Sequence, residues 1–117
     1  MQGNRVTLTF HIIGTLAANP NIRFVLPFDA QLEHVSSVVS GAHPGGLTIG
    51  SSADTDLYVE LIHTGISNTP AEIIRTGFVG TQYPHIAKGT IIVVIVDFDD
   101  DGTACADLTI VLTFSEG

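Results

Sequence analysis

The chain has 117 residues, with 4 lysines and arginines against 12 aspartates and glutamates, and a formal net charge of −8. Charged residues make up 14% of the chain, where about 25% is usual, and the mean hydropathy is +0.40, which is high for a soluble protein. These values exclude a disordered tail, a nucleic-acid binder that acts through many cations and, with Cys105 as the single cysteine, a disulfide scaffold.

Isoleucine, valine and threonine make up nearly a third of the chain, which favours β-sheet, because branched side chains fit a pleated surface. Residues 6–12 alternate strictly between apolar and polar, which predicts a strand with one buried face. Arg5 before this stretch and two alanines after it superficially resemble a signal peptide. The alternation favours a strand instead, and we expect no segment to be removed here.

Further strands follow along the first half of the chain. We expect them at residues 22–28, 31–40, 47–49 and 57–63. Pro27 predicts a sheet edge or a strand end, because proline cannot donate a ladder hydrogen bond. Gly41, Gly45, Gly46 and Gly50 are interpreted as loop hinges, since the lysine of a phosphate-binding loop is missing.

The segment around residues 69–79 has two equally supported interpretations. Thr69 and Pro70 suit the start of a helix, which Gly77 would limit to about two turns. A turn followed by a sixth strand over residues 73–79 explains the pattern as well. Residues 80–84 are predicted to form a loop, and strands are expected at residues 90–96 and 108–114.

The run from Ile91 to Val96 is apolar at every position, so both faces of its strand need to be buried. In a small antiparallel domain one face meets the core, and the other needs a second layer or a second subunit. We therefore predict self-association through Ile91, Val93 and Ile95. The alternative is a monomer with a neutral surface of serine, threonine and glycine.

Seven or eight short strands with frequent turn signals predict an all-β fold. We expect residues 1–117 to form a single-domain antiparallel β-sandwich of about eight strands, jelly-roll-like, with an immunoglobulin-like sandwich as the rival. No run of about 20 apolar residues is present, so no transmembrane helix and no membrane partner are expected.

The segment 97–102 contains the one recognisable ligand motif. Asp97, Asp99, Asp101 and the following glycine match the opening of a calcium-binding loop, in which alternate carboxylates converge on one ion. The twelfth position, however, is Leu108, which cannot ligate, and strands rather than helices are expected around the loop. The alternative is an acidic hairpin turn that keeps one end of the sheet soluble.

Other candidate chemistry is poorly supported. The histidines have no zinc-ligand spacing, and those in strands, His11 and His34, are expected to face solvent or a subunit boundary. Cys105 is expected to be a buried, inert thiol. No nucleophile elbow is present, and Asp54 and Asp56 would need distant partners to serve a glycosidase. We therefore expect no enzymatic activity, no catalytic residues and no cofactor apart from calcium.

The C-terminal part of the chain resembles small structural proteins of tailed bacteriophages. The similarity covers roughly residues 45–117 and is carried by strand and turn signatures at residues 76–79, 86–90, 96–99 and 106–117. Residues 1–44 do not take part in it. Proteins of this kind are often capsid decoration or cement proteins, and several form trimers outside the head.

The resemblance implies a virion protein on the capsid exterior. Its partners would be itself, as a homotrimer, and the major capsid protein, with no nucleic acid bound. It would act by bridging capsomers against internal DNA pressure. The alternative is a tail or fibre module that binds a host surface glycan, with calcium as its cofactor.

Overall fold

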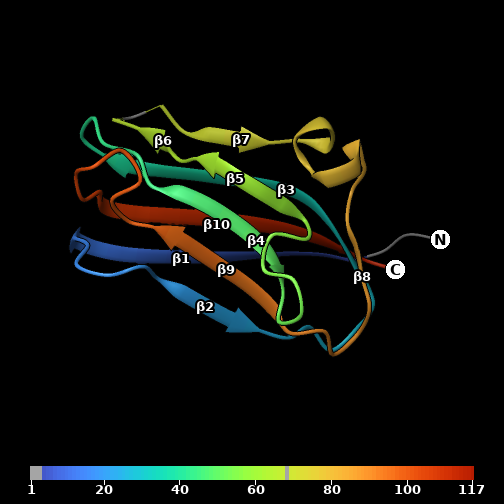
Figure 1. Ribbon diagram of the computed structural model, residues 1–117. Coiled ribbons are helices and arrows are strands. Elements are labelled where there is room, and N and C mark those ends of the chain that lie inside the picture. Colours follow the sequence, from blue (N-terminus) through green and yellow to red (C-terminus); the bar gives the residue numbers. More distant parts are fainter. Residues whose placement is uncertain (1–3, 68) are drawn as a thin grey trace.

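Ten strands form two facing sheets in the computed structural model, which describes residues 4–67 and 69–117 (Figure 1). The larger sheet contains β1 (Arg5–Thr15), β10 (Ala106–Glu116), β3 (Ala30–Ser40), β6 (Gly65–Ile66), β7 (Ala71–Ile73) and β8 (His85–Ile86). The smaller sheet has the order β2 (Asn21–Phe24), β9 (Ile92–Asp97), β4 (Gly46–Ser51) and β5 (Val59–His63). The expected all-β sandwich is confirmed, with more strands than the eight predicted, while the jelly-roll arrangement stays a prediction.

Three long strands form the body of the larger sheet. β1 pairs antiparallel with β10, from Arg5 opposite Ser115 to Ile12 opposite Leu108. On its other side β10 pairs antiparallel with β3, and the three short strands β6, β7 and β8 share the far edge of β3. The alternation predicted for residues 6–12 is observed, because the apolar residues are half-buried and the polar ones are exposed.

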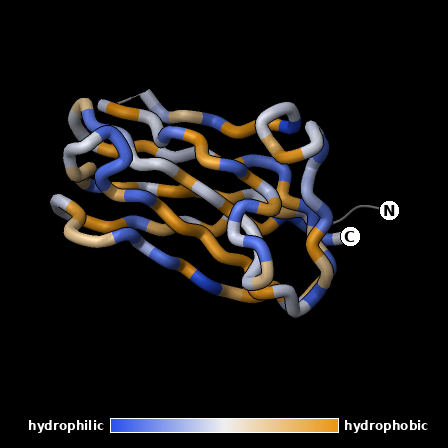
Figure 2. The backbone as a smooth tube through the Cα atoms, viewed as in Figure 1, coloured by the Kyte–Doolittle hydropathy of each residue, from blue (hydrophilic) through white to orange (hydrophobic). Residues whose placement is uncertain are grey.

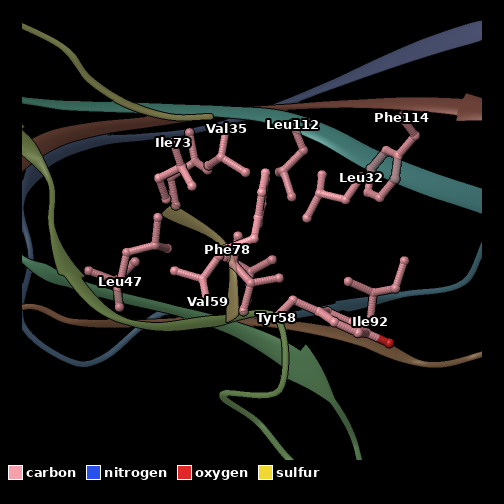
Figure 3. Close-up of a cluster of buried hydrophobic side chains, with 14 of the residues drawn as sticks. Leu32, Val35, Leu47, Tyr58, Val59, Ile73, Phe78, Ile92, Leu112 and Phe114 are labelled. Atoms are coloured by element: carbon pink, nitrogen blue, oxygen red, sulfur yellow. The ribbon is translucent and has the colours of Figure 1, made fainter. Parts of the chain in front are cut away.

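The core lies between the two sheets, as the alternation of apolar residues predicts. Each sheet contributes fully buried aliphatic and aromatic side chains, among them Leu112 and Phe114 from β10 and Ile92 and Val94 from β9. Figure 3 shows how Phe78, which comes from the segment after β7, inserts between the two layers. Phe78 is 2% exposed, so this irregular segment is fixed to the fold by its burial.

Some strand boundaries differ from those predicted. β2 ends at Phe24, three residues before Pro27, and lies at the edge of its sheet, as proline predicts. The interpretation of Gly46 and Gly50 as loop hinges was wrong, because both lie within β4. Their missing side chains make room for neighbours on the outer face of the smaller sheet.

The segment with two interpretations adopts neither in full. Residues 71–73 form strand β7, and two 3-10 turns, η1 (Arg75–Gly77) and η2 (Val79–Thr81), follow it. The second turn occupies part of the predicted 80–84 loop.

No helix in the described residues is long and apolar enough to span a membrane.

Candidate functional site

The first candidate site is the outer face of β9, where the apolar run needs a second cover. Ile92, Val94 and Val96 point into the core and are 0% exposed. The alternate residues point away from the core, and Figure 2 shows mainly hydrophobic colours along this strand. Ile91, just before β9, is 42% exposed and Ile95 is half-buried, but Val93 is fully buried.

The burial of Val93 has its cause within the chain. Val93 lies opposite Gly50 in the β9–β4 register. A Cβ atom on Gly50 would overlap the Asp54 carbonyl oxygen and the Thr55 backbone, so the segment 51–57 folds tightly over this glycine. Hydrogen bonds close the turn, including one from the Ser51 N–H to the Asp54 carbonyl at 2.8 Å. The chain itself therefore supplies the second cover for the middle of β9.

The two ends of this face stay partly open to solvent. We call Ile91 at one end, together with the half-buried Ile95 and the exposed Leu61 towards the other, the exposed apolar patch of the smaller sheet. Leu61, on β5, is 57% exposed and lies over Gly46, where a Cβ atom would come to 2.5 Å from its Cδ1. Of the predicted self-association residues, Ile91 and Ile95 thus belong to this surface and Val93 does not.

The second candidate site is the acidic segment 97–102, which connects β9 in the smaller sheet to β10 in the larger one. It is therefore a crossing between the layers at one end of the sandwich, and the alternative of a hairpin turn was wrong. The Gly102 N–H donates to the Asp99 carbonyl at 2.8 Å, and Gly102 has a φ of +92° that suits glycine. The Phe98 N–H donates to Asn19 Oδ1 at 3.0 Å, which attaches the segment to the β1–β2 connection.

The carboxylates of this segment have separate partners. Asp101 Oδ2 lies 2.9 Å from His43 Nδ1, and this hydrogen bond lowers the pKa of Asp101. Asp100 Oδ2 lies 2.9 Å from His63 Nδ1. The pKa of Asp99 is raised, because its protonated carboxyl can donate a hydrogen bond to the Asp97 carboxylate and because the two carboxylates repel each other when both are ionised.

The predicted calcium ligands are therefore only partly brought together. Asp97 and Asp99 are adjacent, whereas Asp101 is hydrogen-bonded to a histidine from the β3–β4 connection. Within residues 4–67 and 69–117 no three His, Cys, Asp or Glu side chains are grouped as a metal ion would need. Calcium binding stays a prediction.

The other residues considered from sequence have structural partners. His11 is exposed and its Nδ1 lies 2.7 Å from Thr109 Oγ1, and His34 Nε2 lies 2.9 Å from Glu72 Oε1. Cys105 is 0% exposed, and burial raises the pKa of its thiol, as expected for an inert cysteine.

Sequence reasoning missed the part played by Asp107. This residue has a φ of +52° and lies at an irregularity in the pairing of β10 with both neighbours. Its carboxylate accepts from the Gly14 N–H and the Ser40 hydroxyl, both at 2.8 Å, and the Gly14 bond is the main cause of its lowered pKa. The only signal in the sequence is the position of an aspartate just before an alternating strand.

Comparison with known proteins shows a similarity of fold but no significant similarity of sequence. No protein family matches the sequence, and no curated protein is significantly similar to it. One solved structure, a chain of the cyanophage Pam1 capsid asymmetric unit, matches over 99% of this chain and 87% of that one, with a TM-score of 0.61 and 16% identity. The chain shares its fold with a component of a phage capsid. The likeness to phage structural proteins that the sequence suggested is thus confirmed as a likeness of fold.

A second similar structure comes from a pilus. It is a subunit of the disulfide-linked pili that form Bacillus endospore appendages, with a TM-score of 0.50 and 18% identity over 99% of this chain and 90% of that one. Both matches extend over nearly the whole of each partner. This sandwich is therefore a fold found in chains of two kinds of large protein assembly.

Proposed function

We propose that this chain is a non-enzymatic virion protein that decorates the outside of a phage head. The observation that carries the proposal is the fold shared with a chain of a phage capsid unit along nearly its whole length. The sequence resemblance of residues 45–117 to small phage structural proteins supports it independently. In this role the protein is a homotrimer that binds the major capsid protein across capsomer boundaries.

The physical properties of the chain suit such a role. A cement protein needs a stiff body, and two sheets here enclose one continuous cluster of buried side chains that includes Leu32, Ile49 and Ile110. It also needs apolar surface for its neighbours, which the exposed apolar patch of the smaller sheet provides. A net charge of −8 is compatible with the capsid exterior, away from packaged DNA.

The test is the stability of phage particles that lack the protein. Particles from a phage with a stop codon in this gene should release their DNA at a lower temperature than wild-type particles. Adding the purified protein back should restore the wild-type release temperature, because the missing capsomer contacts form again. Release at an unchanged temperature would contradict a cementing function.

The same particles distinguish the alternative location. The likeness to an endospore pilus subunit favours, as a second candidate, a module of an external appendage such as a tail or fibre. Immunogold labelling of wild-type particles should mark the head if the protein is a decoration protein. Labelling confined to the tail would replace the first proposal with the second, in which the ligand is a host surface glycan.

A further inference from the structure

β1 forms a long free edge on one side of the sandwich. It has 11 residues and ends the larger sheet, and among the described residues no strand pairs with its outer side. Figure 1 shows β2, the end strand of the smaller sheet, in front of it on the same side of the molecule. Phe10 of β1 and Phe24 of β2 close the gap between the layers, with ring centroids 5.7 Å apart.

The direction of the backbone groups on β1 follows from its pairing with β10. The Glu116 N–H donates to the Asn4 carbonyl, so the even-numbered residues direct their backbone groups towards β10. In an antiparallel ladder this direction alternates from one residue to the next. The N–H and C=O groups of residues 5, 7, 9, 11 and 13 therefore point to the free edge.

The features that usually protect an edge strand from pairing are missing from β1. It contains no proline, lysine, aspartate or glutamate, and its one irregularity lies at the end, between Ile12 and Thr15. The other edges are shorter: β6, β7 and β8 have two or three residues each, β2 has four, and β5 has five and carries Glu60, whereas the one charged residue of β1 is Arg5 at its very start. A long, unprotected edge is a template for another strand.

The sequence of β1 is complementary to itself in one antiparallel register. With a two-fold axis beside Thr9, each Thr9 lies opposite the Thr9 of the second copy. All odd-numbered residues then form hydrogen-bonded pairs, which gives about ten new backbone hydrogen bonds. On the inner side, Leu8 lies opposite Phe10, in the closely spaced type of pair. Leu8 and Phe10 are half-buried in one chain and already pack against the core.

The charges of β1 suit the same register. In a chain with 12 acidic and 4 basic residues, this strand brings no carboxylate to the edge. Arg5, whose Nε lies 3.4 Å from Glu33 Oε1 in its own chain, lies opposite the uncharged Ile13 of the second copy. The register therefore places no like charges opposite each other.

We propose that two copies of this chain associate through their β1 strands, paired antiparallel about a two-fold axis at Thr9, so that the larger sheets become one continuous sheet. The contact is isologous, since each copy contributes the same surface. It goes beyond the proposed function, because it uses a different side of the molecule from the exposed apolar patch.

The test uses cysteines at two positions of β1. The two Thr9 Cα atoms would be about 5.5 Å apart, within the span of a disulfide. The two Thr7 Cα atoms would be displaced by about 14 Å along the strands, beyond that span. Under mild oxidation Thr9→Cys should form a disulfide-linked dimer and the matched control Thr7→Cys should not. The native Cys105 is fully buried and does not compete.

A second variant tests the pairing without a covalent link. Thr9→Pro removes an N–H that points to the free edge, so it should leave the β1–β10 ladder intact while abolishing pairing. Sedimentation should show the dimer paired through β1 in the wild type. In Thr9→Pro this dimer should be lost, while the circular dichroism spectrum stays unchanged. Linkage of Thr7→Cys but not Thr9→Cys, or equal mass of wild type and Thr9→Pro, would overturn the proposal. Neither result would bear on whether the protein decorates a capsid.

Discussion

The negative charges of two aspartates, Asp99 and Asp107, change the stability of this fold in opposite directions. Asp99 lies beside Asp97, whose carboxyl raises the pKa of Asp99, so ionisation at neutral pH opposes folding. Asp107 accepts hydrogen bonds from the Gly14 N–H and the Ser40 hydroxyl, which lower its pKa, so its ionisation favours folding. Both side chains are exposed, and their effects come from immediate neighbours.

The same chemical change at these two positions should therefore act in opposite directions. We expect Asp99→Asn to raise the melting temperature at pH 7 and Asp107→Asn to lower it. Asparagine tolerates the positive φ of residue 107, so backbone strain does not confuse the comparison. Thermal unfolding of both variants beside the wild type provides the measurement.

The pH dependence gives the sign of each contribution. The stability that Asp107 adds is present above its unfolded pKa, about 3.9, and is lost as the pH falls through its lower folded value. The penalty at Asp99 is present above its raised folded pKa and is relieved as the pH falls through that value. Both differences from the wild type should thus shrink in acid. This account would be contradicted if Asp99→Asn melted at a lower temperature than the wild type at pH 7, and if the difference persisted both in acid and after calcium was removed.

At the scale of the element, β4 shows how a glycine can be required inside a strand. Gly50 allows the segment 51–57 to fold against the outer face of the smaller sheet, and this cover buries Val93 on the neighbouring strand. The segment that looked like a hinge in the sequence is thus a place of close backbone approach.

Gly50→Ala should accordingly be strongly destabilising. The added methyl group would overlap backbone atoms of Asp54 and Thr55, which cannot move as a flexible side chain can. We expect a loss of about 1–3 kcal/mol in the free energy of unfolding, as is typical of overpacking, measured by urea denaturation. Thr48→Ala, on the same strand and half-buried, is the control and should cost much less. Equal stability of the two variants would contradict a close backbone approach at Gly50.

At the scale of the whole molecule, the two exposed contact surfaces make different contributions to assembly. The proposed homotrimer uses the apolar patch of the smaller sheet, whereas the β1 contact uses the edge of the larger sheet. Neither surface includes the acidic end of the sandwich, where Asp101 and Asp100 bind histidines. Asp100 nevertheless adjoins the apolar patch, because its carboxylate and Leu61 both lie over Gly46.

The trimer should depend on Ile91. We expect Ile91→Lys to reduce the solution mass threefold in a background that carries Thr9→Pro, because a buried lysine would lack a partner in the trimer contact. Ile74→Lys is the matched control, since Ile74 is 57% exposed and directly follows β7, which belongs to the larger sheet. Light scattering after size exclusion measures the mass. Loss of the trimer in both variants, or in neither, would argue against a contact at Ile91.

The amino-acid sequence alone determined the fold class and the positions of the long strands. Alternation over residues 6–12 and 108–114 fixes which side chains enter the core, because a strand with one apolar face has only one way to bury it. The apolar run before Asp97 also showed that one strand needs cover on both faces. These are local properties, readable from neighbours in the chain.

Only the tertiary structure decided what covers the second face of that strand, and which acidic residues meet. Val93 is buried by a segment about forty residues away, at a glycine whose pairing partner no local pattern reveals. Asp101 meets His43, and Asp107 meets Gly14, through strand pairing between distant parts of the chain. The free edge of β1 likewise exists because strand order places it last, and strand order depends on contacts between residues far apart in sequence.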